Sequence, residues 1–152
     1  MILSLDLGLK TGVAVRTKLG IKSCTIYLKK NGKTFEQQLV YFYHFLNKIN
    51  EISHLHGEEL EVVFEMPHGG YFASTRILFS LIGCIYLFSG TTGVKTTEYS
   101  PKSIKKFWTN NGNASKEEMM EVTKAKYGKP VADDNESDAV AQLFYHISLK
   151  GS

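Results

Sequence analysis

The chain has 152 residues, of which 43% are hydrophobic, and a formal net charge of +3 at pH 7. This length and composition predict a single domain over residues 1–152 with one buried core. No run of roughly 18 uncharged apolar residues occurs, and Asp6 interrupts the N-terminal apolar segment, so neither a membrane span nor a signal peptide is expected. The two cysteines lack metal-ligand spacing and favour reduced thiols in a cytosolic protein.

The first part of the chain predicts strands joined by tight turns, followed by a helix. Apolar runs bounded by turn residues predict three strands, over 2–7, 12–17 and 21–28. Thr34 is placed to cap a helix that runs to about residue 54, because apolar side chains recur there at helical spacing. The apolar run 60–65 then predicts a fourth strand.

The second part of the chain predicts helices around one further strand, over 94–99. The apolar segment 77–88 is expected to be a core helix, too short to span a bilayer. Proline at a first helical turn and a capping-box pattern mark two later helix starts. The helices are predicted to begin at Ser74, Ser100, Ser115 and either Asp133 or Asp134, and to end near residues 88, 108, 127 and 149.

This order of elements predicts an α/β fold. It consists of a mixed five-stranded sheet, with three antiparallel strands followed by two parallel ones, flanked by helices. The order is similar to that of the ribonuclease H-like fold, although other α/β folds approach it.

Four acidic residues are predicted to meet at one edge of this sheet. Asp6 lies in the first strand and Glu65 ends the fourth, while Asp134 and Asp138 are one helical turn apart in the last helix. A carboxylate in or at the end of a buried strand is costly unless it is paired or binds metal, and the same runs contain no Lys or Arg. The four acids therefore indicate a site for divalent cations. The structural alternatives are hydrogen bonding of Asp6 to backbone amides and an N-cap role for Asp134.

Several motifs occur in order along nearly the whole chain: Leu5 to Gly8 with Gly12 to Ala14, Phe64-Glu65, the small-residue helix 78–83, Tyr99 to Lys105, Gly112 to Lys116, and Asp134 to Ala141. Each motif alone is weak, but together they are specific. In this order and at this spacing they resemble the RuvC-type Holliday junction resolvases of the ribonuclease H-like superfamily. The likeness is greatest to the short versions carried by bacteriophages.

The chain departs from the family at the last acidic pair. The family places its two closing acids three residues apart, and the residue three before Asp138 is Asn135. Asp134 is the first choice for the missing carboxylate, because residues four apart share a helical face. Asp133 and Glu136 are the other candidates, and Asn135 is an alternative as a neutral oxygen ligand.

The resemblance implies phosphodiester hydrolysis with two Mg²⁺ ions, for which Mn²⁺ can substitute. Asp6 would bridge both ions, and Glu65 would hold the ion at the leaving group. Asp138, helped by Asp134, would hold the ion that activates water. The products would carry 5′-phosphate and 3′-hydroxyl ends.

Basic and aromatic residues are expected to contact DNA. Lys105 and Lys116 resemble family positions that contact phosphate near the scissile bond, and Lys116 adds a catalytic charge at a helix N-terminus. Lys102 and Lys106 would extend this groove, although lysines of this kind are often only solvated surface. The aromatic loop residues Tyr71 and Phe72 would wedge into unpaired bases, or alternatively pack on the sheet.

The resemblance also implies branched DNA as the partner, in the cytoplasm of a bacterial or phage-infected cell. Cutting two opposed strands requires two active sites, so a homodimer is expected. Its interface would include part of the 78–88 helix or of the Tyr41-Phe42-Tyr43 cluster. The alternatives are a general flap or fork debranching nuclease and a non-catalytic junction-binding protein. An ATPase of the broader group that shares the Asp-x-Gly motif is disfavoured, because 152 residues are too few for two lobes around ATP.

Overall fold

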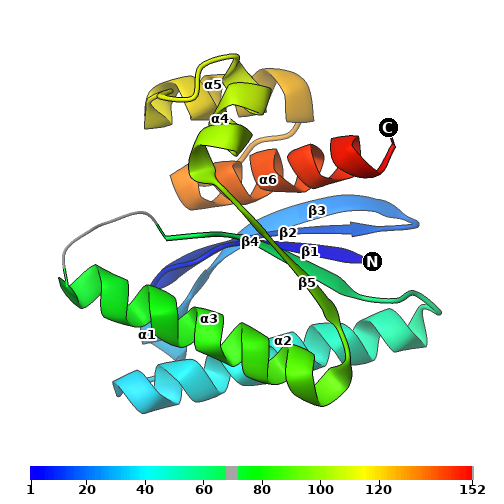
Figure 1. Ribbon diagram of the computed structural model, residues 1–152, viewed down its shortest axis with the longest axis vertical. Coiled ribbons are helices and arrows are strands. Elements are labelled where there is room, and N and C mark those ends of the chain that lie inside the picture. The colour runs from blue at the N-terminus through cyan, green and yellow to red at the C-terminus, as the bar shows by residue number, and fades with distance from the viewer. Residues whose placement is uncertain (68–71, 152) are drawn as a thin grey trace.

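The structure is a computed structural model that describes residues 1–67 and 72–151. A five-stranded sheet lies between two layers of helices (Figure 1). Its strands are β1 Ile2–Asp6, β2 Lys10–Thr17, β3 Gly20–Tyr27, β4 Glu61–Glu65 and β5 Lys95–Tyr99.

The strand order is β3-β2-β1-β4-β5. Strands β1, β2 and β3 pair antiparallel, whereas β4 pairs parallel to both β1 and β5. The predicted mixed sheet is therefore confirmed. Because β1 is the central strand and runs parallel to β4, their last residues, Asp6 and Glu65, reach the same edge of the sheet.

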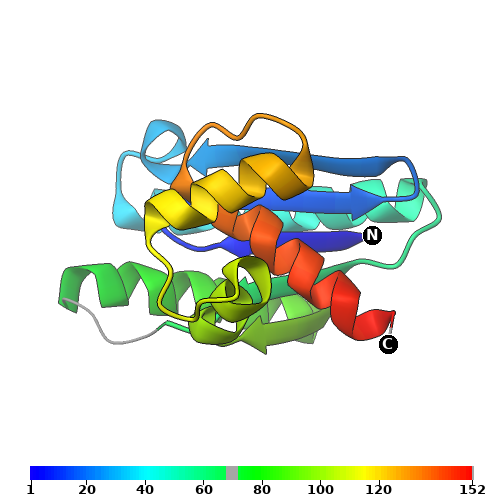
Figure 2. The ribbon, with the colours of Figure 1, turned by 90° about the horizontal axis from the view of Figure 1, so that it is seen from above.

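Helices cover both faces of the sheet, with α2 and α3 on one face and α4, α5 and α6 on the other (Figures 1 and 2). Their bounds are α1 Leu28–Asn31, α2 Phe35–Leu55, α3 Phe72–Thr92, α4 Pro101–Thr109, α5 Lys116–Tyr127 and α6 Asp134–Lys150. The short helix α1 lies where the sequence predicts the end of the third strand. Its first residue, Leu28, is fully buried, so the apolar pattern continues after the strand has ended.

The helix caps are largely those expected. Thr34 and Ser115 each form a capping box with the residue three positions on. Asp133, not Asp134, caps α6, since its Oδ1 accepts a hydrogen bond of 3.0 Å from the Glu136 amide. The Asp133 carboxylate also accepts a bond of 2.6 Å from the Thr25 hydroxyl of β3. Asp134 is thus free of the capping role.

Only one face of helix α3 belongs to the buried core. Buried side chains such as Ile77, Leu81 and Ile85 face the sheet, whereas Phe79 and Leu87 are 58% and 59% exposed. The window Thr75–Thr92 is long and apolar enough to cross a bilayer by length and composition, and 28% of it is buried. The segment 77–88, expected to be a core helix too short to span a bilayer, is thus part of a longer apolar helix. The same test is passed by helices of soluble proteins.

A close approach of backbone to backbone places α6 on the sheet. A Cβ atom added at Gly12 of β2 would lie 1.8 Å from the carbonyl oxygen of Asn135. Only glycine fits here, because any side chain would push the first turn of α6 off the strand. The N-terminus of α6 consequently lies over the end of β2 that pairs with Asp6.

Candidate active site

Asp6 and Glu65 border one small hollow at the edge of the sheet. The hollow has a volume of 230 Å³, and Met66, Pro67 and residues of α3 line its other side. Both carboxylates are half-buried, as the end positions of two inner strands require. Asp6 and Glu65 therefore lie together at one edge of the sheet, as the sequence predicts.

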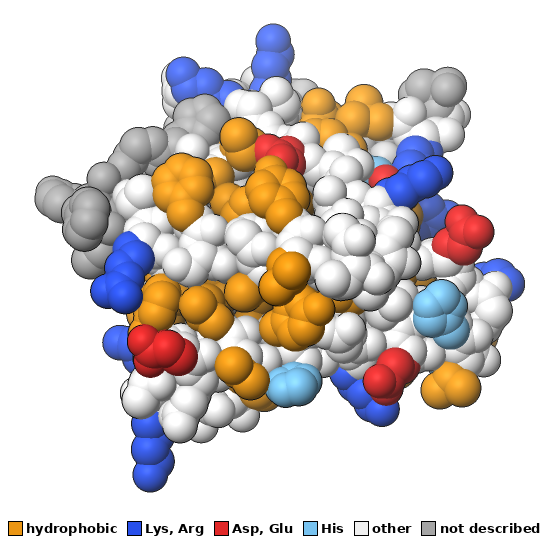
Figure 3. Space-filling view, turned by 60° about the horizontal axis from the view of Figure 1, so that its bottom comes forward, with side chains coloured by type: hydrophobic (Ala, Val, Ile, Leu, Met, Phe, Trp, Pro, Cys, Tyr) orange, Lys and Arg blue, Asp and Glu red, His pale blue; other side chains and the backbone are white. Residues whose placement is uncertain are grey.

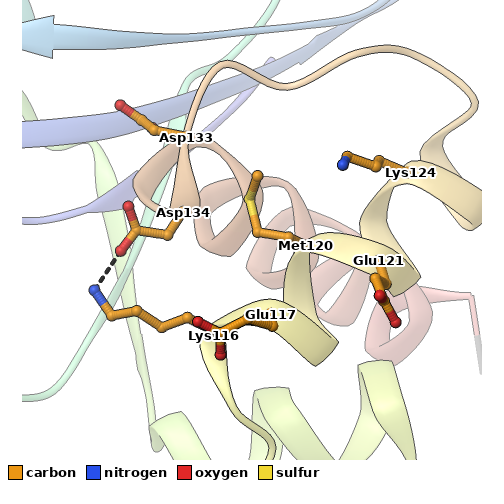
Figure 4. Close-up of a pocket in the computed structure, with 7 residues that line it drawn as sticks. All are labelled: Lys116, Glu117, Met120, Glu121, Lys124, Asp133 and Asp134. Atoms are coloured by element: carbon orange, nitrogen blue, oxygen red, sulfur yellow. Dashed lines mark hydrogen bonds and ion pairs between the residues drawn. The ribbon is translucent and has the colours of Figure 1, made fainter.

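The first two turns of α6 bring Asp134 and Asp138 toward the same edge. Asp138 is half-buried, and Asp134 forms an ion pair with Lys116 of α5 (Figure 4). The other acid of this turn, Glu136, is buried and accepts bonds of 2.6 Å from Ser23 Oγ and 2.7 Å from the Ala132 amide. Glu136 therefore has a structural role and is not available as a ligand.

The pKa values show that these four carboxylates act on one another. Burial raises the pKa of Asp6 well above its usual range, and Asp138, Glu65 and Asp134 raise it further, against a smaller opposing effect of Lys116. Burial and then Asp138 raise the pKa of Glu65 to about 7, against the effect of Lys105. Burial is also the main cause that raises the pKa of Asp138 to about 6. Crowded, desolvated carboxylates of this kind are frequent at functional sites.

This donor set fits a hard divalent cation. Among residues 1–67 and 72–151, no three acidic, histidine or cysteine side chains already converge as a finished metal cage. Mutual repulsion keeps unneutralised carboxylates apart, and Lys116 holds Asp134 in an ion pair. A bound cation would remove the repulsion that raises the pKa of Asp6, and carboxylate oxygens are the ligands that Mg²⁺ and Mn²⁺ prefer.

The lysines of α4 and α5 divide into two groups. Lys105 and Lys116 are close enough to the acids to lower the pKa of Asp138, and the Lys105 ammonium donates a bond of 2.9 Å to the Ala114 carbonyl. Lys116 lowers the pKa of Asp134, chiefly through its hydrogen bond. Lys102 and Lys106 are exposed on α4. Tyr71 and the side chain of Phe72 lie outside the described residues.

A wider hollow opens beside Asp134, between α5 and the start of α6 (Figure 4). Its volume is 540 Å³, and its lining mixes both charges, including Lys116, Glu117, Lys124 and Asp133. Lys116 and Asp134, which form an ion pair, both line this hollow.

A buried polar contact that the sequence analysis missed joins the three elements that carry the acids. Ser4 Oγ in β1 donates to the Ala139 carbonyl of α6 at 2.8 Å. Gln142 Nε2 of α6 donates to Ser4 Oγ at 2.8 Å and to the Val63 carbonyl of β4 at 2.9 Å. Both side chains are fully buried. The signal was a polar residue within an apolar run: Ser4 between two leucines, and Gln142 between Ala141 and Leu143.

Removal of this contact is expected to affect metal binding as well as stability. Ser4→Ala and Gln142→Leu should each lower the free energy of unfolding by about 1–3 kcal/mol, because buried partners lose hydrogen bonds. Both should also weaken Mn²⁺ binding, measured by calorimetry, because α6 is released from β1 and β4. Leu46→Ala, in the core on the other sheet face, is the matched control: it should destabilise the protein without changing Mn²⁺ affinity. Equal metal affinity in all variants would contradict this role.

Without metal, the free energy of unfolding is expected to fall as pH rises from about 4.5 to 7. The folded-state pKa values of about 7 for Glu65 and about 6 for Asp138 exceed the ordinary values of 4.5 and 3.8. The folded chain therefore binds more protons than the unfolded chain in this window, and stability present at low pH is lost as the two groups ionise.

The loss should be on the order of 2 kcal/mol and visible as a lower Tm in EDTA at pH 8 than at pH 5. Adding Mg²⁺ or Mn²⁺ at pH 8 should restore it. Glu65→Gln should flatten the pH dependence. A Tm in EDTA that rises steadily from pH 5 to pH 8 would count against this account.

Comparison with known proteins supports the resemblance. No protein-family model matches the chain. Two proteins named crossover junction endodeoxyribonuclease RuvC, from Brachyspira hyodysenteriae and Bdellovibrio bacteriovorus, are 36% and 37% identical over 66 and 65 residues, or 43% and 42% of this chain. The matched segments span 41% and 39% of the length of those two relatives, which is less than half of each.

The fold matches over a longer range. Thermus thermophilus RuvC in complex with a Holliday junction substrate is similar with a TM-score of 0.70 at 18% identity, covering 98% of this chain and 93% of that one. A second Thermus thermophilus RuvC structure gives a TM-score of 0.65 at 17% identity, covering 99% and 96%. The chain therefore has the RuvC variant of the ribonuclease H-like fold, and the RuvC-type resemblance of its sequence motifs is confirmed.

Proposed function

We propose that this protein is a metal-dependent endonuclease that cuts four-way DNA junctions. The observation that carries the proposal is the meeting of Asp6, Glu65 and Asp138 at one sheet edge, where burial and neighbouring carboxylates raise the pKa of each. Such a site is costly for the folded chain unless a cation occupies it. The relatives named RuvC support the junction as substrate.

Two bound divalent ions, about 3.5–4 Å apart, would supply the nucleophile, stabilise the developing charge and assist the leaving oxygen. Asp6 is central among the acids, so it would contribute to both ion sites. Glu65 would complete the site on the side of β4, and Asp138, helped by Asp134, the site on the side of α6. Mg²⁺ is the expected ion and Mn²⁺ a substitute, because all proposed ligands are carboxylates.

The lysines would hold the scissile phosphate. Lys116 would exchange its ion pair with Asp134 for a contact with a phosphate oxygen, which frees Asp134 for the cation. Lys105 would lie on the other side of the acids, near Glu65 and Asp138. Lys102 and Lys106 would follow the DNA backbone along α4. Tyr71 and Phe72 remain proposed as residues that enter the branch point.

The test uses a fixed and a mobile synthetic four-way junction, a flap and a plain duplex, each with Mg²⁺, Mn²⁺ or EDTA. We expect paired symmetric nicks in the junction with 5′-phosphate and 3′-hydroxyl ends, and no nicks in EDTA. Equal cutting of flaps would favour a general debranching nuclease. Tight junction binding without cutting would leave the non-catalytic alternative, which Asn135 and the ion-paired Asp134 favour.

We propose further that the protein is a homodimer that pairs through α3. Phe79, Gly83, Tyr86, Leu87 and Gly90 are exposed along one face of this helix. A Cβ atom at either glycine would meet nothing within 4 Å, so a second helix has room to approach closely. Figure 3 shows apolar side chains gathered over the α2 and α3 layer. An apolar area of this kind is typical of an interface between subunits.

Leu87→Glu is expected to convert the dimer to a monomer, since a charge would be buried at the interface. Sedimentation at several protein concentrations measures this change. Leu19→Glu is the matched control, because Leu19 is equally apolar and more exposed, in the turn between β2 and β3. A monomeric wild type, or a dimer that survives Leu87→Glu, would rule out this interface.

Residues 1–152 are proposed to form one nuclease domain that acts in the cytoplasm, where bacterial and phage DNA is found. The exposed face of α3 would then be covered by a second subunit and not by lipid. A bacteriophage origin stays a prediction.

A further inference from the structure

A second group of basic side chains lies at the end of the sheet that carries the acids, on the side opposite α4 and α5. Lys10 opens β2 four residues after Asp6, and Lys29 and Lys30 lie on α1, which directly follows β3. Lys33 follows in the turn before α2, and all four lysines are exposed. Figure 1 shows α1 below the sheet, at the same end as the beginning of α3, whereas α4 and α5 lie above it.

The segment that carries these lysines is fixed to the core. Leu28 is fully buried, and its amide donates a bond of 2.9 Å to the Leu9 carbonyl. A Cβ atom at Gly32 would lie 2.6 Å from the Gln38 amide nitrogen, so the turn packs directly on the backbone of α2. The side-chain amide of Gln38 also donates a hydrogen bond of 3.1 Å to the Gly32 carbonyl. The lysines therefore project from a preorganised support.

The lysines gather without carboxylate partners. The Lys30 ammonium lies 4.5 Å from the centre of the Tyr27 ring, and the Lys10 ammonium lies 6.0 Å from it. In the parts of the chain that the structure describes, none of the four lysines forms an ion pair. Lys30 and Lys33 line a groove of 730 Å³ in which Glu36 is the one acid among the lining residues. Unpaired like charges at one place favour a polyanionic ligand.

The geometry of cleavage requires a surface of this kind. The DNA strand that is cut continues on both sides of the scissile phosphate, whereas Lys102, Lys105, Lys106 and Lys116 all belong to α4 and α5, on one face of the sheet. The acids themselves repel the backbone where no cation is bound. The DNA on the far side of the scissile phosphate therefore needs a separate basic support.

We propose that Lys10, Lys29, Lys30 and Lys33 bind the phosphate backbone of the DNA arm that leaves the acidic centre away from α4. This inference rests on the proposed function, which it extends to a second DNA contact. Lysines act here as point charges on phosphate, so the contact carries affinity and orientation without sequence preference.

The test compares two triple variants in an Asp6→Asn parent, which prevents cutting during the measurement. One variant carries K29Q, K30Q and K33Q, and the control carries K18Q, K22Q and K95Q, which removes the same charge at the opposite end of the sheet. Binding to a fixed four-way junction is measured by fluorescence anisotropy over a series of salt concentrations. A further triple variant with K29R, K30R and K33R tests whether charge is sufficient.

The first variant should bind about 10- to 100-fold more weakly at about 0.1 M salt, with the slope of log K against log salt reduced by about 2 to 3. The control should keep the parental slope and differ by no more than about twofold in affinity, and the arginine variant should bind like the parent. Equal binding and slope in both glutamine variants would overturn this inference alone. A parent that binds the junction no better than plain duplex would instead overturn the proposed function.

Discussion

Asp6→Asn is expected to slow junction cleavage by about a thousandfold or more, equivalent to roughly 4 kcal/mol of activation free energy. Asp6 ends the central strand, and it is the one carboxylate whose pKa is raised by all three of the others. Asn keeps the shape of the side chain but removes the charge that a shared cation ligand needs. Cleavage is measured under single-turnover conditions with saturating Mg²⁺ and then Mn²⁺.

The same substitution should make the metal-free protein more stable. Burial and three neighbouring carboxylates oppose ionisation of Asp6, so its replacement by a neutral amide removes an unfavourable interaction at neutral pH. We expect a higher Tm in EDTA and no further increase on addition of metal. Glu51→Gln is the matched control, because Glu51 is an exposed acid of α2 that pairs with Lys48. Near-normal cleavage by Asp6→Asn would refute the metal site proposed here.

Asp138→Asn should be far more damaging than Asp134→Asn. Burial raises the pKa of Asp138 to about 6, whereas the hydrogen bond from Lys116 lowers the pKa of Asp134. Asp134 is thus already neutralised by a neighbour, and Asp138 is not. We expect losses of about a hundredfold or more for Asp138→Asn and about tenfold for Asp134→Asn in the cleavage rate.

Measuring the Mg²⁺ concentration for half-maximal cleavage separates the two roles. Asp138→Asn should raise this Mg²⁺ concentration strongly, while Asp134→Asn should change it less. Lys116→Ala serves as the companion variant, since it releases Asp134 and removes a phosphate contact together. If Asp134→Asn and Asp138→Asn prove equally inactive, Asp134 binds the cation as directly as Asp138 does.

The sheet and the two strand-end acids were predictable because their signals are local. Apolar runs bounded by turn residues define the strands, and a carboxylate at the end of such a run is conspicuous in the sequence. The strand order followed from the succession of elements. The capping boxes at Thr34 and Ser115 were likewise visible, since the residues that form each box are only three positions apart.

The features that were missed depend on contacts between distant segments. The sequence leaves Asp133 and Asp134 open as the cap of α6, and the bond from Thr25 of β3 to Asp133 is a contact that no local pattern reveals. The Ser4–Gln142 contact joins residues 138 positions apart. The apolar composition all around α3 does not distinguish its buried face from its exposed face. The predicted third strand includes Leu28, the first residue of α1, because its side chain is apolar.

The contact between Ser4 and α6 has a consequence for the order in which the protein becomes active during synthesis. The sheet and its two strand-end acids emerge from the ribosome first, but Ser4 finds its partners, Ala139 and Gln142, only when α6 has emerged. Asp134 and Asp138 arrive on that same last helix. A nascent or prematurely terminated chain that lacks α6 would hold only two of the four proposed metal ligands. The proposed nuclease activity would therefore be withheld until translation has passed α6.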